Sequence, residues 1–301
     1  MIRMDIDQEK TYEHQSVLVK PVVSLLLART GGLYVDATFG GGGHTRALLE
    51  ADPTCRVIGC DWDKDALAIN VPLIQEQYPG RFDFVWGNFS RLPALLKDKG
   101  IVRVDGILAD FGTSQYQIAH KPGFSFREDR ELDMRMSPSH GELTAYELVN
   151  FTSEKELADI LYRYGEEHAS RRIARELAVA RKKKRITSTK ELAGLIEGII
   201  PRRKGAIHPA TKSFQALRIV VNRELENIET LLKIAPQLLS VGSRLACISF
   251  HSLEDRIVKQ FFKEHPEYFS IITKKVVVAD QDELKANPSS RSAKLRVAER
   301  V

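Results

Sequence analysis

The first third of the chain alternates short apolar runs with segments whose apolar residues recur at helical spacing. The apolar runs are rich in β-favouring residues and cover 33–37, 56–60, 82–86 and 104–109. Helical spacing covers 44–50 and 64–77, between the first three runs. Strands that alternate with helices in this way form parallel sheets with helices packed on their faces. The pattern therefore predicts an α/β, Rossmann-like fold for this part of the chain.

The pattern changes after the fourth apolar run. Residues 111–139 are rich in Gly, Pro, Ser and charged residues, and residues 143–217 show the helical period without a convincing strand. Strand character returns at 244–249 and 271–279. We therefore predict a discontinuous sheet domain of residues 1–115 and 216–301, interrupted by a mainly helical second domain of residues 116–215.

A glycine-rich turn follows the first predicted strand, and an acid follows the second. The turn holds Gly40 to Gly43, and Asp61 stands about twenty residues beyond the first glycine. Glycines let the backbone lie close to a ligand, and a carboxylate at this spacing can accept hydrogen bonds from both hydroxyls of a ribose. Because ligands bind beyond the carboxyl ends of parallel strands, loops 40–45, 61–63 and 110–117 should meet at one nucleotide-like cofactor.

The form of the turn favours a cationic cofactor over a diphosphate. Dinucleotide-binding turns usually read G-x-G-x-x-G, whereas here Asp36 stands four residues before Gly40. A carboxylate beside the turn would repel phosphate and attract the ammonium and sulfonium groups of S-adenosylmethionine (SAM), whose ribose Asp61 would hold. The sequence therefore predicts SAM. An NAD-dependent oxidoreductase is the alternative enzyme class, and a glycine loop without a ligand is the alternative reading of the turn.

Composition indicates a globular protein of the cytoplasm. Of the 301 residues 43% are apolar, which is enough for a buried core, and no apolar run approaches the roughly 20 residues that span a bilayer. The acidic start lacks the apolar core of a secretory signal, so we expect a cytoplasmic chain without a membrane partner. Cys55, Cys60 and Cys247 show no C-x-x-C spacing, which indicates reduced, buried thiols rather than disulfides or zinc.

The positive charge is concentrated in the middle of the chain. The net charge is +5, and residues 118–215 hold 19 Lys and Arg against 14 Asp and Glu. Residues 168–185 alone carry eight basic residues and one acid. Clusters of this kind bind phosphate backbones, although a solvated helix face gives the same pattern. The candidate RNA-binding residues are Arg171, Arg172, Arg175, Lys182, Lys183, Lys184 and Arg185.

Several longer strings carry a resemblance to a known family. They include His14 near the start and the strings Asp36-x-Thr-Phe-Gly-x-Gly-Gly-His44, Asp105-Gly-Ile-Leu-x-Asp110, Leu132-Asp-Met-Arg-Met136, Phe214-Gln-Ala-Leu-Arg-Ile219 and Ile248-Ser-Phe-His-Ser-Leu-Glu-Asp-Arg256. With these strings in this order, the chain resembles the bacterial 16S ribosomal RNA (cytosine-N4) methyltransferases of the MraW/RsmH type along nearly its whole length. The resemblance implies a Rossmann-like SAM-dependent methyltransferase sheet with an inserted helical domain that helps to hold RNA.

The resemblance also implies a substrate and a set of cofactor contacts. The substrate would be a decoding-region cytidine of 16S rRNA, either naked or in the small ribosomal subunit, methylated on N4. Carried over residue by residue, the cofactor contacts would be Gly42, Gly43, His44, Asp61, Phe89, Asp110 and Gln117. The alternative is a non-catalytic RNA-binding ribosome assembly factor, in which the predicted cofactor loops would bind no cofactor. The sequence leaves open whether the chain forms a homodimer.

One loop departs from the family pattern. The family often reads D-L-G-V-S-S-P-Q after its fourth strand, whereas this chain reads Asp110-Phe-Gly-Thr-Ser-Gln-Tyr-Gln117. Ser114 and Gln117 align with the family pattern, but Gln115 and Tyr116 do not. The following stretch, residues 118–123, is one residue shorter than the same stretch in the family. We therefore expect a different route for RNA into the site.

The residues also indicate where the chemistry lies. The exocyclic amine of cytosine is a weak nucleophile, so the site should supply acceptors that orient it and take up its developing charge. Asp110 and Ser114 are the candidate catalytic residues. Methylation at a ring carbon would need a nucleophilic cysteine, and all three cysteines lie in or beside predicted strands.

Two further segments have structural alternatives. His251, Glu254 and Asp255 could suggest a metal site, but neighbouring acids point to different faces of a helix. Helix capping and an ion pair with Arg256 are therefore expected, and no metal is predicted. The tail 290–296 is predicted to be either an edge strand or a second RNA contact.

Overall fold

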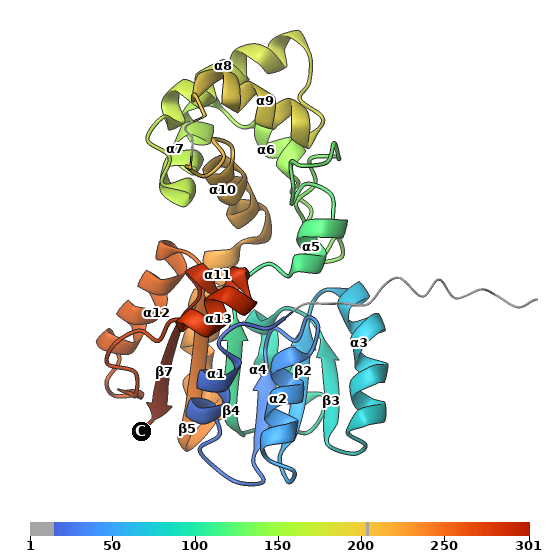
Figure 1. Cartoon of the computed structure of the whole chain (residues 1–301), viewed down its shortest axis with the longest axis vertical. Helices are drawn as coiled ribbons and strands as arrows, with labels where there is room; N and C mark the ends of the chain where they lie inside the picture. Colours follow the sequence, from blue (N-terminus) through green and yellow to red (C-terminus); the bar gives the residue numbers. More distant parts are fainter. Residues whose placement is uncertain (1–14, 203–204) are drawn as a thin grey trace, which may run out of the picture.

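A seven-stranded sheet forms the base of the molecule in the computed structural model, which describes residues 15–202 and 205–301 (Figure 1). His14 lies outside the described residues. The strand order across the sheet is β3-β2-β1-β4-β5-β7-β6. The strands are β1 Leu33–Asp36, β2 Arg56–Asp61, β3 Phe82–Trp86, β4 Val104–Asp110, β5 Leu239–Ser249, β6 Phe269–Ile271 and β7 Lys294–Arg300.

The first five strands run parallel and are joined by helices, as the alternating pattern predicted. β1 pairs with β2 and β4, and β4 pairs with β5, all in parallel register. The helices of this part are α1 Val19–Leu26, α2 Gly43–Ala51, α3 Lys64–Gln77, η1 Phe89–Arg91, α4 Leu92–Lys97, α11 Glu224–Leu238, α12 Ser252–Glu264, α13 Gln281–Ala286 and η2 Pro288–Ser292. The predicted Rossmann-like α/β architecture is confirmed.

Both faces of the sheet are buried, because successive residues of each strand enter different apolar clusters. Val35 and Ile107 pack in one cluster with α4 and α11, and their neighbours Tyr34 and Leu108 pack in the other with α1 and α2. Side chains alternate between the faces of a strand, so continuous apolar runs are typical of a sheet covered on both sides. The same packing explains why the four apolar runs of the first third of the chain predicted β1 to β4 correctly.

The C-terminal part differs from the prediction in two places. Residues 271–279 were expected to form a strand, but β6 covers only Phe269–Ile271, and beyond it only Val277 forms an isolated bridge, to Leu295. The tail is β7, which pairs antiparallel with β5 on one side and β6 on the other. It is therefore an interior strand and not the predicted edge strand, while the alternative of a second RNA contact stays a prediction. Its apolar residues Leu295 and Val297 are buried, while its basic residues alternate with them.

A helical lobe is inserted between β4 and the returning sheet (Figure 1). Its helices are α5 Gln115–His120, α6 Ala145–Phe151, α7 Glu154–Gly165, α8 Ser170–Lys183, α9 Thr189–Ile199 and α10 Thr211–Asn222. A third apolar cluster forms its core and includes Leu161, Ile173 and Ile196. The predicted boundary at residue 215 falls inside α10, whose Phe214, Leu217 and Val221 all pack in this cluster. We therefore propose that the inserted domain extends to the end of α10.

No helix in the described part of the chain is long and apolar enough to cross a bilayer. Cys55, Cys60 and Cys247 are free and buried, as predicted.

Candidate cofactor and substrate site

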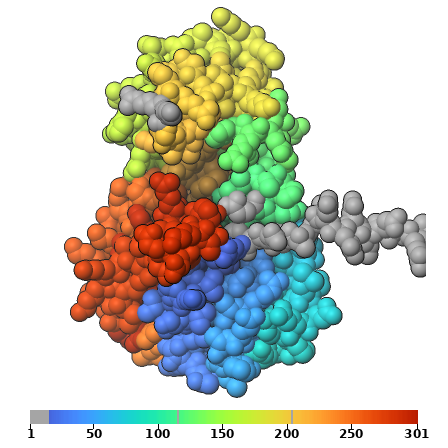
Figure 2. Space-filling view, viewed as in Figure 1, coloured from blue at the N-terminus to red at the C-terminus, as the bar shows by residue number. Residues whose placement is uncertain are grey.

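A cavity of about 270 Å³ opens where β1, β2 and β4 end, between the sheet and the helical lobe. In Figure 2 the two lobes meet at a narrowed region at this level of the molecule. The lining residues come from the loops after these strands, from α5, and from the helices that return to the sheet. They include Gly40, His44, Asp61, Phe89, Asp110, Ser114 and Gln117. The three predicted loops therefore do meet at one site.

The glycine turn and the distant acid are bonded to each other. The backbone N–H of Gly40 donates to Asp61 Oδ2 at 2.7 Å, and the N–H of Asp63 donates to Asp61 Oδ1 at 2.8 Å. Gly40 and Gly42 have φ of +49° and +72°, a region that favours glycine. Burial raises the pKa of Asp61 to about 7, against the opposing effect of these two hydrogen bonds. Both carboxylate oxygens keep a further lone pair for a ligand.

Asp36 does not have the role predicted from the turn. It is buried and is absent from the cavity wall. Its carboxylate accepts hydrogen bonds from Thr45 Oγ1 at 2.8 Å and from the backbone N–H of Thr38 at 3.3 Å. Burial raises the pKa of Asp36 above its ordinary value. Asp36 therefore fixes the turn, and the acids that line the cavity are Asp61, Asp110 and Glu224.

His44 and Asp110 are polar residues of the cavity wall whose polar atoms are incompletely bonded. His44 Nε2 lies 3.6 Å from Asp110 Oδ2, and both ring nitrogens of His44 and Oδ1 of Asp110 are buried without a hydrogen-bond partner. Buried polar atoms are normally hydrogen-bonded, so these atoms indicate a place for a polar ligand. Gly42 and Gly43, two other predicted contacts, lie at the start of α2, beside the lining residues Gly40 and Gly41.

Ser114 and Gln117 form the cap of α5. Ser114 Oγ accepts from the N–H of Gln117, and the Gln117 side chain accepts from the N–H of Ser114. Gln117 also donates to Asp63 Oδ2 at 3.1 Å, which ties the helical lobe to the loop after β2. Lys121, in the segment that departs from the family pattern, binds Asp63 Oδ1 at 2.8 Å. Phe89 lines the cavity and packs against Phe111, with 6.0 Å between the centroids of the two rings.

The seven predicted RNA-binding residues lie away from the cavity. They belong to α8 and the two residues after it, at the end of the helical lobe that is remote from the sheet (Figure 1). All seven are exposed. Two of them also support the fold, because Arg172 donates to the carbonyl of Ile199 and Arg185 donates to the carbonyl of Asn150 at 3.0 Å. The structure therefore separates a basic surface from an acidic cavity.

Sequence reasoning missed a charged pair on the cavity wall. Arg218 of α10 donates through Nε and Nη2 to the two oxygens of Glu224, at 2.9 Å each. Both residues line the cavity. Arg218 lies inside one of the strings that carry the family resemblance, which was the available signal, but nothing in the sequence joins it to Glu224. The cavity wall also includes Phe250, which lies inside another of these strings, and Ser16 and Ser289, for which the sequence gave no signal.

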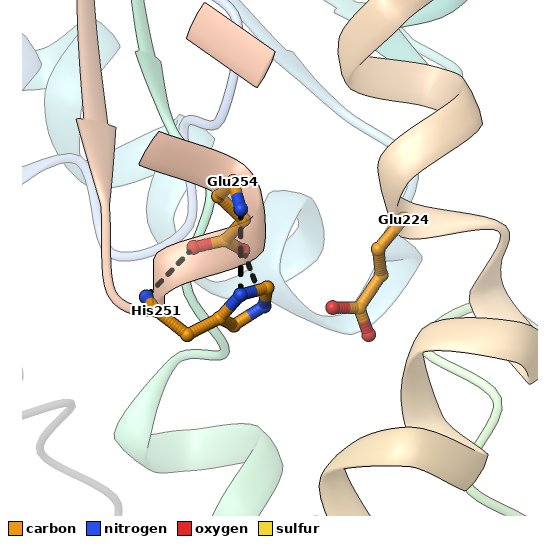
Figure 3. Close-up of side chains that lie close together, drawn as sticks. All are labelled: Glu224, His251 and Glu254. Carbon is orange, nitrogen blue, oxygen red and sulfur yellow. Dashed lines mark hydrogen bonds and ion pairs between the residues drawn. The ribbon is translucent and has the colours of Figure 1, made fainter. Parts of the chain in front are cut away.

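Glu224, His251 and Glu254 form a cluster whose potential ligand atoms lie within 4.8 Å of one another (Figure 3). The predicted cap is confirmed: Glu254 accepts from the N–H groups of Phe250 and His251, and His251 Nδ1 accepts from the N–H of Glu254. The predicted ion pair with Arg256 is wrong, since Asp255 binds Arg296 at 2.6 Å. Arg218 binds Glu224 and so balances the charge of one of the two acids of the cluster.

The cysteines are unsuited to attack a base. None of the three lines the cavity. Burial raises the pKa of Cys55 to about 11, and burial also raises the pKa of Cys60 and Cys247. Thiolates are the nucleophilic form, so these thiols are unreactive.

Comparisons with known proteins find relatives along nearly the whole chain. A family model described as the MraW methylase family matches residues 11–301. A protein of Sorangium cellulosum named "Ribosomal RNA small subunit methyltransferase H" is 47% identical over 291 residues, which cover 96% of this chain and 91% of that protein. A protein of the same name from Coprothermobacter proteolyticus is 48% identical over 290 residues, which cover 95% of both chains.

Proposed function

The chain belongs to the MraW methylase family, and from this membership we propose that it is a SAM-dependent methyltransferase that methylates N4 of a decoding-region cytidine in small-subunit rRNA. The observation that carries the proposal is the meeting of the glycine turn, Asp61 and Asp110 at one cavity. SAM supplies an electrophilic methyl group when bound. The relatives' names support rRNA of the small subunit as the substrate.

The residues of the cavity fit SAM better than a dinucleotide. Asp61 offers two carboxylate oxygens to the hydroxyls of a ribose, and Phe89 offers a ring face beside the same loop. Asp110 and His44 leave buried polar atoms unbonded near the turn. The acids of the wall, Asp61, Asp110 and Glu224, favour a cationic amino acid end and disfavour a diphosphate. The NAD-dependent oxidoreductase is therefore the weaker reading.

Asp110 is the best placed acceptor for the amine of the target base. Its Oδ1 is buried without a partner, and a positioned carboxylate can orient an amine and take up its proton. Ser114 is the second candidate, although its Oγ also caps α5. The reacting nitrogen must come within about 3 to 3.5 Å of the methyl carbon, so the wall has to position the base closely.

The basic surface of α8 supports binding to RNA outside the cavity. Its exposed arginines and lysines can contact phosphates that flank the target, while the target base enters the cavity. A base in a duplex could not reach the cavity, so the target must be single-stranded or flipped outward. Because the proposed substrate is the RNA of ribosomal subunits, the protein acts in the cytoplasm. A homodimer stays a prediction, as does the altered RNA route near residues 115–123.

Methyl transfer to small subunits tests this proposal. The protein is incubated with isotopically labelled SAM and small ribosomal subunits from a strain that lacks this methyltransferase, and the rRNA nucleosides are then separated by mass spectrometry. We expect labelled N4-methylcytidine at one site. Label on another base, or none with subunits and naked rRNA alike, would count against the proposal and in favour of a non-catalytic assembly factor.

A further inference from the structure

The cavity has a second part that the predicted cofactor contacts do not account for. It is lined by Thr113 after β4, Arg218 at the C-terminal half of α10, and Glu224 and Asn227 at the start of α11. These helices join the two lobes, so this wall lies where RNA held by the helical lobe would meet the sheet. The inference below rests on the proposed cytidine N4 methylation.

Arg218 is held so that part of its guanidinium remains available. Its Nε and Nη2 bind the two oxygens of Glu224 at 2.9 Å, and its Nη1 lies 3.4 Å from Thr113 Oγ1. Arginine has five N–H donors in a fixed plane. The two short bonds use two of these donors, and the long contact to Thr113 uses a third weakly. At least two donors therefore remain at a residue that lines the cavity.

The surroundings of Arg218 are acidic. Glu224 and the fully buried Glu254 face each other across His251, as Figure 3 shows for these three side chains. Burial lowers the pKa of Arg218, but the charges of Glu224 and Glu254 outweigh this effect and raise it overall. Asp110, three residues before Thr113, adds a further acid to the wall. The arginine thus stays charged while the wall as a whole is negative.

This charge balance indicates what Arg218 binds. A phosphate would gain from one arginine but would be repelled by at least three acids, and the basic residues of α8 offer it a far better place. A neutral pyrimidine base carries no charge for these acids to repel. Its ring nitrogen and carbonyl can accept hydrogen bonds from a guanidinium.

The hydrogen-bonding groups of cytosine are complementary to both the acids and the arginine of this wall. Its N4 amine is a donor for the acids, and its N3 and O2 are acceptors for Arg218. Uracil presents the opposite groups at two of these positions, an O4 acceptor and an N3–H donor. We propose that Arg218, oriented by Glu224, binds the N3 and O2 edge of the target cytosine and determines the choice of cytosine over uracil.

A combined change in enzyme and substrate tests this proposal. Arg218→Lys keeps the charge and loses the planar fork, and 3-deazacytidine at the target position replaces N3 by a carbon that cannot accept a hydrogen bond. Single-turnover methyl transfer is measured at saturating SAM for all four combinations. Arg223→Lys is the matched control, because Arg223 is exposed and pairs with Glu226 on the surface.

We expect each change alone to slow transfer by about tenfold or more, the value of one hydrogen bond to a charged group. The double change should be no slower than either single change, since both remove the same contact. SAM affinity should stay at the wild-type value in R218K and R223K, and R223K should keep the wild-type thermal midpoint. If R218K does not fold, Glu224→Gln, which loosens the fork while keeping Arg218, should reduce the effect of 3-deazacytidine.

Effects of R218K and 3-deazacytidine that multiply independently would overturn the proposal and point to a phosphate or to another part of the RNA. Transfer at the wild-type rate by R218K would overturn it as well. In both of these outcomes the wild-type enzyme still methylates N4, so the proposed function stands. Absence of N4 methylation by the wild-type enzyme would instead refute the proposed function itself.

Discussion

Asp61 accepts a 2.7 Å hydrogen bond from the backbone N–H of Gly40, so the acid after β2 and the glycine turn after β1 form one bonded unit. The two residues are 21 positions apart in the chain. The bond fixes the carboxylate beside the turn, and burial raises the pKa of that carboxylate to about 7. A group that titrates near neutral pH at a predicted ribose contact should make cofactor binding depend on pH.

SAM affinity should rise as the pH increases through about 7. Below this value Asp61 is protonated and loses an acceptor for the ribose hydroxyls. The linkage to stability has the opposite sign: the folded-state pKa is raised, so the contribution of Asp61 to stability is present at low pH and is lost as the pH rises through about 7. Calorimetric titration with SAM at several pH values measures the first effect. Asp61→Asn should bind more weakly with a flat profile, and an unchanged profile would assign the titration to another group.

Gly42→Ala should destabilise the cofactor turn. Gly42 has φ of +72°, and an added Cβ would lie 3.0 Å from the ring of Phe39. The left-handed backbone alone costs a non-glycine residue about 1–2 kcal/mol. Urea unfolding and SAM titration check the loss of stability and affinity. Gly194→Ala is the control, because this helical position is open and alanine should stabilise α9 by about 0.5–1 kcal/mol.

Asp110→Asn should slow methyl transfer more than it weakens SAM binding. The amide keeps the size of the side chain but loses the charge that stabilises the developing cation, which is worth about 10²- to 10³-fold in rate. Single-turnover transfer at saturating SAM measures the effect. Asp98→Asn, at an exposed position after α4, is the control. A defect that disappears at high SAM concentration would limit Asp110 to cofactor binding.

Replacing Arg171, Arg172 and Arg175 by Gln should weaken RNA binding and leave SAM affinity nearly unchanged. These residues are exposed on α8, and each lost phosphate contact reduces the salt dependence of binding. The slope of log affinity against log salt should fall by about two to three. The charge-matched control replaces the exposed Lys97, Lys259 and Lys263 of the sheet domain. Equal losses for both triple variants would indicate only a general effect of net charge.

Asn222→Ala should destabilise the protein by about 2–4 kcal/mol. The buried Asn222 side chain accepts from the N–H of Met136 and donates to the carbonyl of Met134, at 2.8 Å each. Its loss leaves both backbone groups without a partner at the end of α10. Urea unfolding measures the difference, and the exposed Gln237→Ala should change stability by less than about 0.5 kcal/mol. A small effect for Asn222 would mean that water replaces both bonds.

The sequence predicted those parts of the structure that depend on local pattern. The strands from Leu33 to Asp110 and the helical insertion follow from apolar spacing, because the strands are buried on both faces and the helices on one. The position of β7 between β5 and β6 could not be predicted, since strand order depends on pairing between distant segments. The same holds for the pair of Arg218 and Glu224, which only the packing of α10 on α11 brings to the cavity.

Asp36 shows why an electrostatic argument from sequence can reach a sound conclusion through the wrong residue. The acid beside the turn is buried against Thr45, and the acids that line the cavity are instead Asp61, Asp110 and Glu224. Sequence spacing identified an acidic loop region. It could not identify which carboxylates face a ligand, because that depends on the direction of each side chain.

The most direct test of the account is a crystal structure of the protein with S-adenosylhomocysteine, the demethylated form of the cofactor. We predict that its ribose hydroxyls bind Asp61 and that its amino acid end lies between the glycine turn and Asp110. Density for the ligand elsewhere in the molecule, or a dinucleotide bound at the turn in its place, would contradict the central claim.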